Sequence, residues 1–404
     1  MGISFSDKKK RIYIEASIVL FLFTLGLVLR FVFLGCVTAD TGNFILWFNY
    51  VRDIGDISAF KDFIGDYNVT YVALLYMSTF LPFSDIVCVK LTAIFFDLLG
   101  PVVGFLFLKE MALEKGKSAE AARHYGELGA ALVWLSPITI GNSGYQAQLE
   151  ALWAFTGLLS LYLVMKKHPV WGMVLFGFSF AMKPQGIFFL PILIWLYYRE
   201  KSFSILHFLI VPAVVQVLCI PSMMAGNSFF HFWKHFLGDQ ASMYPYVYYY
   251  YPNIWIWMRE LPYWIFGKVG IGMMLTAFAL VTVRFVKDCR ERSWTFAQDL
   301  ELTLWALMTC VMFLPAMHER YNFPAEVMLP VLAVFDKKYR VPAGVLVVSG
   351  FLCNGMAYYG WGKPEFYGLS LMNMAVYVCL TAGMIGTLCG RTAKTASLEK
   401  GGAV

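Results

Sequence analysis

Long apolar runs recur along almost the whole of this 404-residue chain. A helix that crosses a bilayer needs about 20 consecutive apolar residues, with a range of roughly 17–25. The runs that reach or approach this length are residues 12–34, 86–108, 127–141, 148–165, 169–183, 186–198, 203–223, 262–286, 299–316, 321–335, 341–361 and 366–389. We therefore expect an all-α, polytopic transmembrane protein with about twelve spans. Its shorter runs should form tilted helices or helices shielded by their neighbours.

The composition agrees with a protein that has the bilayer as its solvent. Charged residues make up 14% of the chain, whereas a soluble domain carries about 25%. The net charge of +6 comes from short Lys and Arg clusters between the apolar runs, so we expect no nucleic-acid partner. The cysteines show no C-x-x-C spacing, which argues against a metal site or a disulfide framework. The first run is too long for a signal-peptide core and should be retained.

The basic clusters orient the predicted spans. They lie at residues 8–11, 109–123, 166–167, 199–201, 284–292, 337–340 and 391–394. Twelve crossings place all of them on one side, which the positive-inside rule identifies as the cytoplasm, so both termini should be cytoplasmic. Residues 69–81 are apolar but short, and counting them as a span would move the 109–123 cluster outside. We therefore expect residues 69–81 to lie in the outer surface of the membrane.

Two outer loops interrupt a single transmembrane domain of residues 1–390. The first loop, residues 35–85, is acidic, and apolar residues recur at helical spacing in its stretch 40–56. This pattern predicts an amphipathic helix on the outer surface. The second loop, residues 224–261, is rich in aromatic residues, as is typical of an interfacial girdle. Residues 391–404 are small and polar, and they predict a disordered cytoplasmic tail.

Five polar clusters lie at the predicted outer ends of helices. They are residues 38–42, 65–68, 142–150, 183–185 and 318–321. Ionisable groups in or near spans are costly and mark functional sites, so these clusters predict one active site opposite the basic loops. Simpler roles are capping by Asp40, an Asx turn at Asp66, a helix-start charge at Glu150 and headgroup contact by Lys183. Asp97, inside a span, should pair with another group or face a polar groove.

The polar clusters resemble motifs of the GT-C superfamily of membrane glycosyltransferases. The closest likeness is to bacterial relatives of the second mannosyltransferase of GPI-anchor synthesis. The matching elements, in the family's order, are A-D-T-G-N at 39–43, D-Y with Tyr71 at 66–71, K-L-T-A-I-F-F-D at 90–97, N-S with Gln148 at 142–150, K-P-Q at 183–185, N-I-W at 253–255 and M-H-E-R-Y-N-F-P-A at 317–325. The chain departs from the family pattern at Thr92, Gln146, Ala147 and Glu150, where the family has Pro, Trp, Gly and Asp.

The resemblance implies inverting transfer of a sugar, typically mannose, from a polyprenyl-phosphate donor to an acceptor on the outer or lumenal face. Asp40 would be the catalytic base that activates the acceptor hydroxyl. Arg320, His318 and Lys183 would stabilise the departing phosphate. The full set of predicted substrate- and donor-binding residues is Asp66, Tyr67, Gln148, Glu150, Lys183, Gln185, His318, Glu319, Arg320 and Tyr321.

The expected partners are the lipid-linked donor, membrane lipids and an acceptor that the sequence does not identify. The glycine-rich fingerprints of nucleotide-binding enzymes are absent from the sequence, which agrees with a lipid-linked donor. A divalent cation is left open as a cofactor. The protein would lie in the plasma membrane of a bacterium or in the endoplasmic reticulum membrane of a eukaryote. Two other functions remain as alternatives: a secondary transporter, and a lipid-linked acyl or phosphoryl transferase.

Overall fold

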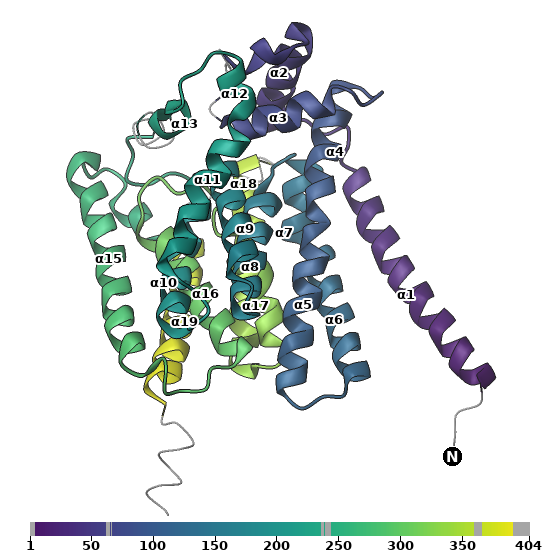
Figure 1. Ribbon diagram of the computed structural model, residues 1–404, viewed down its shortest axis with the longest axis vertical. Helices are drawn as coiled ribbons and strands as arrows, with labels where there is room; N and C mark the ends of the chain where they lie inside the picture. The colour runs from purple at the N-terminus through teal and green to yellow at the C-terminus, as the bar shows by residue number, and fades with distance from the viewer. Residues whose placement is uncertain are drawn as a thin grey trace, which may run out of the picture.

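The computed structural model describes residues 5–61, 65, 67–235, 238, 244–358 and 366–390. Every element within these ranges is a helix (Figure 1), which confirms the predicted all-α class. Asp66 and the predicted tail, residues 391–404, lie outside the described residues.

The first half of the chain, up to residue 199, contains α1 (Phe5–Phe31), α2 (Ala39–Ile54), η1 (Ile57–Phe60), α3 (Val69–Ser78), α4 (Asp85–Asp97), α5 (Leu99–Glu114), α6 (Ala119–Trp134), α7 (Pro137–Ile140), η2 (Gly141–Tyr145), α8 (Glu150–Met165), α9 (Pro169–Met182), η3 (Pro184–Phe189) and α10 (Leu190–Arg199). The second half contains η4 (Ile205–Leu209), α11 (Ile210–Leu218), α12 (Ile220–Met224), α13 (His231–Lys234), η6 (Ile254–Met258), α15 (Tyr263–Asp288), α16 (Phe296–Phe313), α17 (Phe323–Ala333), η7 (Lys337–Tyr339), α18 (Arg340–Tyr358) and α19 (Tyr367–Cys389).

Five helical stretches among the described residues are long and apolar enough to cross a membrane. They are Tyr13–Phe31, Asp85–Glu114, Tyr263–Lys287, Phe296–Phe313 and Tyr367–Cys389. Each coincides with a predicted span, so membrane-spanning helices are supported at these five places. Several further predicted spans correspond to apolar helices of 10–17 residues, such as α8 and α9.

Some predicted spans are interrupted in the structure, among them residues 186–198 and 203–223, which do not form single continuous α-helices. The first is divided between η3 and α10, and the second among η4, α11 and α12. Proline stands in the first turn of η3, α10 and α12. Proline lacks a backbone N–H and clashes with the preceding turn, so it starts a helix more readily than it continues one. Both stretches are apolar, as the sequence shows, but proline divides each of them into shorter helices.

Burial separates the central helices from the outer ones. Most residues of α8, α16 and α17 are buried, whereas only 11% of the apolar stretch in α1 and 22% of that in α15 is buried. Figure 1 shows α1 and α15 at opposite margins of the bundle. Their exposed apolar side chains form surfaces that suit lipid rather than water.

Helices α5 and α6 form an antiparallel pair that depends on small residues. A Cβ atom added to Gly129 would lie 2.1 Å from the backbone oxygen of Gly104. The two backbones therefore touch at a point that only glycine permits. Small residues at such crossings are typical of helix pairs that pack within membranes.

The two ends of the described chain lie at the same end of the molecule. In Figure 1 the start of α1, the α5–α6 connection and the last residues of α19 lie at the bottom, whereas α2, α3, α12 and α13 lie at the top. Helix α2 covers most of the predicted amphipathic stretch 40–56 and buries Phe44, Trp47, Phe48 and Val51 on one face. A helix there is therefore confirmed.

Candidate functional site

Five charged side chains from four separate segments meet at the end of the bundle that carries α2. Asp40 lies in the first turn of α2, Glu150 is the first residue of α8, and Lys183 follows the end of α9. Glu319 and Arg320 lie in the connection between α16 and α17. We call these five residues the charge cluster. All but Asp40 are buried, and the Asp40 side chain is 26% exposed.

Arg320 is the centre of the charge cluster. Its Nη1 lies 3.3 Å from Asp40 Oδ2 and 2.5 Å from Glu319 Oε1. Its Nε lies 3.3 Å from Glu150 Oε1. A guanidinium presents five N–H donors in a planar fork, so one arginine can contact several carboxylates at once. Arg320 therefore links three segments that are remote in sequence.

Glu150 is the most enclosed carboxylate of the cluster. Lys183 Nζ donates to its Oε1, and the indole N–H of Trp153 donates to its Oε2. Glu150 also starts α8, where a negative charge suits the helix dipole, so the simpler explanation fits its position. The headgroup explanation for Lys183 is wrong, because this side chain is buried and paired within the protein.

Two uncharged side chains extend the cluster toward the segment between η1 and α3. The Gln148 side-chain amide donates to Asp40 Oδ2 over 2.5 Å, and the Tyr67 hydroxyl donates to Gln148 Oε1 over 3.0 Å. Lys183 Nζ also lies 4.9 Å from the centroid of the Tyr67 ring, within cation–π range. Thr38, rather than Asp40, caps α2 by accepting a hydrogen bond from the backbone of Thr41. The capping explanation of Asp40 is therefore wrong.

His318 lies beside the charge cluster in an aromatic environment. Its ring centroid is 4.6 Å from that of Tyr249, 4.9 Å from Tyr321 and 5.2 Å from Tyr244. Burial, reinforced by the positive charges of Arg320 and Lys183, lowers the pKa of His318 to about 2. The imidazole is therefore neutral near pH 7. It can donate or accept a hydrogen bond but supplies no positive charge to a phosphate.

The other predicted site residues are placed less centrally. Tyr321 lies near the cluster, with its ring 6.0 Å from the Arg320 guanidinium carbon. Gln185 is buried in η3, two residues from Lys183, and its Oε1 accepts no hydrogen bond from the described part of the chain. Asp66 lies outside the described residues, although its neighbour Tyr67 reaches Gln148. All five predicted polar clusters therefore contribute at least one side chain to this region.

Three residues of the site were not predicted as parts of it. Trp153 holds Glu150, and Tyr244 and Tyr249 pack on His318. The two tyrosines belong to the aromatic loop 224–261, whose composition predicted only a membrane-interface role. Nothing in their spacing separates them from the other tyrosines of that loop, because their partner lies about 70 residues farther along the chain.

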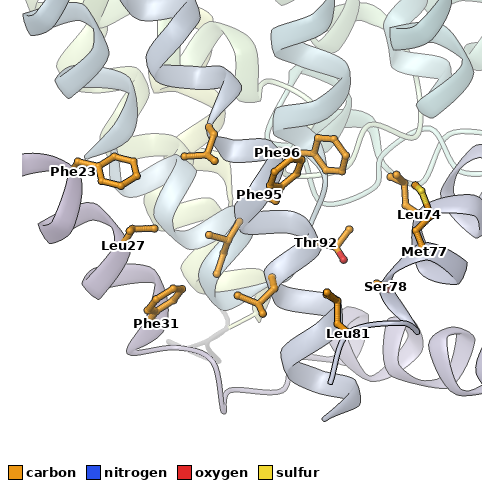
Figure 2. A pocket seen from close by; sticks show the side chains of 13 residues that line it. Phe23, Leu27, Phe31, Leu74, Met77, Ser78, Leu81, Thr92, Phe95 and Phe96 are labelled. Carbon is orange, nitrogen blue, oxygen red and sulfur yellow. The ribbon is translucent and has the colours of Figure 1, made fainter. Parts of the chain in front are cut away.

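An apolar groove lies between α1, α3 and α4 (Figure 2). It has a volume of about 530 Å³. Its lining includes Phe23 and Leu27 of α1, Met77 of α3, and Thr92 and Phe95 of α4. Helices α3 and α4, which form two of its walls, also pack against α2, the helix that carries Asp40. Two of the helices that line the groove therefore also support the helix that carries Asp40.

The charge cluster offers two kinds of chemistry side by side. Asp40 is a partly exposed carboxylate that can accept a proton, and Arg320 and Lys183 are cations that can stabilise an anion. Within the described ranges, no group of three or more His, Cys, Asp or Glu residues is arranged to hold a metal ion. No protein-family model matches this chain, and no curated protein matches it.

Proposed function

We propose that this protein is a membrane glycosyltransferase of the GT-C kind. It transfers a sugar, with mannose as the first candidate, from a polyprenyl-phosphate donor to an acceptor hydroxyl, with inversion at the anomeric carbon. The observation that carries the proposal is the contact between Asp40, the exposed carboxylate of the charge cluster, and Arg320, its central cation. A base and a phosphate-binding group are the two requirements of this reaction.

The proposed reaction is a single displacement. Asp40 takes the proton of the acceptor hydroxyl while that oxygen forms a bond to the anomeric carbon of the donor sugar. The bond between this carbon and the phosphate oxygen breaks, and its electron pair remains on the phosphate. Arg320 and Lys183 stabilise the charge that develops there. The products are the glycosylated acceptor, polyprenyl phosphate and a protonated Asp40, which then releases its proton to solvent.

Donor binding would also free the base. The charge cluster contains three carboxylates and two cations, so a phosphate can approach Arg320 only if a carboxylate withdraws. Asp40 is the most exposed carboxylate of the cluster and one of the two at the longer distance of 3.3 Å from Arg320. We therefore infer that the donor phosphate replaces Asp40 at Arg320, whereas Glu150 and Glu319 keep the guanidinium oriented.

An apolar groove on helices that pack against α2 supports a lipid-linked donor. The groove between α1, α3 and α4 is lined almost entirely by apolar side chains, and it can take part of a polyprenyl chain (Figure 2). In this proposal the chain crosses the membrane about twelve times, as the basic loops require. Both termini are cytoplasmic, and the charge cluster faces the outer or lumenal side of the plasma or endoplasmic reticulum membrane.

The test is donor turnover by the purified protein in liposomes. Polyprenyl-phosphate mannose, labelled in the sugar, is supplied with membrane extract as a source of acceptor, and GDP-mannose serves as the water-soluble control donor. The proposal predicts loss of label from the lipid donor, no use of GDP-mannose, and release of polyprenyl phosphate. Uptake of labelled solute without any chemical change would instead identify a transporter. Phosphate appearing on the acceptor would identify a phosphoryl transferase.

A further inference from the structure

Two fully buried cations of α1 and α4 lie outside the charge cluster. Arg30, near the end of α1, and Lys90, in α4, are both 0% exposed. Burying a charge costs several kcal/mol unless its partners satisfy it. The partners of these two side chains therefore show which part of the protein the two charges stabilise.

Lys90 joins the end of α1 to an irregular turn. Its Nζ donates to the backbone oxygens of Phe33, Gly144 and Tyr145 over 2.5, 2.9 and 3.1 Å. An ammonium group has three N–H donors, so these carbonyls use its full capacity. Gly144 and Tyr145 end the π-helical turn η2, and Phe33 follows α1.

Arg30 holds the same turn from the other side. Its Nε donates to Asp97 Oδ2 over 2.7 Å. The Ser143 hydroxyl, inside η2, donates to the same carboxylate oxygen. Arg30 Nη2 also donates to Thr139 Oγ1 over 3.3 Å, and the guanidinium lies 3.8 Å from the centroid of the Trp134 ring. Asp97 thus pairs with Arg30 of α1, which is one of the two environments that the sequence predicted for it, and that pair is tied to η2.

The turn leads directly into the charge cluster. After η2, Ala147 adopts a left-handed conformation with φ of 58°, which costs a non-glycine residue about 1–3 kcal/mol. The backbone N–H of Gln148 then donates to Asn142 O over 2.9 Å. These features aim the Gln148 side chain at Asp40 and start α8 at Glu150. A π-helical turn followed by a left-handed alanine is not a conformation that the segment would keep without support.

We propose that Arg30 and Lys90 are positioning residues for the transfer reaction. They hold residues 141–149 in the conformation in which Gln148 orients Asp40, and they touch neither donor nor acceptor. This inference rests on the proposed function for its kinetic test, but the geometry it describes can also be tested without any substrate.

The kinetic test replaces Lys90 with methionine, which is unbranched and only one atom shorter and which removes the three N–H donors. Lys90→Met should lower kcat by about 10²-fold, the scale of misplacing a catalytic group by about 1 Å, with KM for the donor unchanged within about threefold. Lys90→Arg should restore part of the loss. Lys115→Met, in the exposed α5–α6 connection, is the matched control and should keep wild-type kinetics.

A double-mutant cycle separates positioning from general weakening of the fold. Gln148→Ala should lower kcat, and adding Lys90→Met should lower it little further, because both changes remove the same orientation of Asp40. Fully additive losses would overturn the inference, as would wild-type kcat in folded Lys90→Met. If Lys90→Met does not fold, Ser143→Ala, which removes only the hydroxyl donor to Asp97, takes its place in the same cycle.

The structural test uses Cys36, whose backbone N–H donates to Phe33 O. When the exposed cysteines Cys379 and Cys389 are replaced by serine, Cys36 is the remaining cysteine that is not buried. Lys90→Met should speed maleimide labelling of Cys36 several-fold, because Phe33 O loses one of its two donors and the segment that carries Cys36 loses its anchor to α4. Unchanged labelling would refute the geometry. If the wild type transfers no sugar but labelling accelerates as expected, the proposed function fails and the support of residues 141–149 by the buried cations stands.

Discussion

Arg320 gives the most specific prediction for stability, because it contacts three carboxylates and two of them are buried. Glu150 and Glu319 are 0% and 1% exposed. Arg320→Ala would leave Glu150 with Lys183 and Trp153 but would remove the closest cation from Glu319. Breaking a buried ion pair by removing one partner costs about 3–5 kcal/mol. We therefore expect Arg320→Ala to be strongly destabilised, mainly through Glu319.

The origin of this loss can be tested by a second change. Glu319→Gln in the Arg320→Ala background removes the buried charge that has lost its closest cation and should recover at least about 1–2 kcal/mol, because a neutral amide is cheaper to bury than a carboxylate. Thermal unfolding in detergent, followed by tryptophan fluorescence, should show a midpoint lowered by several degrees in Arg320→Ala and partly restored in the double variant. An unchanged midpoint in Arg320→Ala, or a further fall on adding Glu319→Gln, would refute this account of the cluster.

Three further predictions concern the rest of the molecule. Because the pKa of His318 is lowered to about 2 in the folded protein, only the unfolded chain binds a proton at this residue between pH 6.5 and about 2. The free energy of unfolding should therefore fall below pH 6.5 by at most about 1.4 kcal/mol per pH unit. His318→Gln should make the thermal midpoint depend less on pH in this range. Gly129→Ala should cost about 2 kcal/mol or more by forcing α5 and α6 apart, whereas Gly386→Ala, with open space around it, should keep the wild-type midpoint. Cysteines introduced at Asp53 and Lys115 should react with an impermeant reagent from opposite sides of sealed membranes. Reaction of both from one side would mean that residues 69–81 cross the membrane.

The sequence predicted the broad arrangement because that arrangement depends on composition and charge. Apolar runs located the helices, and the parity of the basic loops placed Asp40, Glu150, Lys183 and Arg320 together at one set of helix ends. The structure brings these four side chains into contact. No detailed geometry was needed for that prediction, since loops that share a side of the membrane share a face of the bundle.

The pairings behind the site could not be predicted in the same way. Which residue pairs with Asp97 depends on how α1 and α4 are rotated about their axes, and hydropathy carries no information on that rotation. The left-handed Ala147 follows a turn whose carbonyl groups accept hydrogen bonds from Lys90 of another helix. The packing of Tyr249 on His318 joins a loop to a distant connection. Each of these features is set by tertiary contacts rather than by local sequence preference.

The central claim, that Asp40 is the base of a glycosyl transfer, is tested most directly by one comparison. Transfer of labelled mannose from polyprenyl-phosphate mannose is measured for the wild type, Asp40→Asn and Asp53→Asn, with donor binding measured in parallel. Asp53 lies on the same helix, with its side chain 70% exposed, and is the matched control. We predict that Asp40→Asn binds the donor but transfers sugar about 10²-fold more slowly or worse, whereas Asp53→Asn transfers at the wild-type rate. Near-normal transfer by Asp40→Asn would contradict the claim.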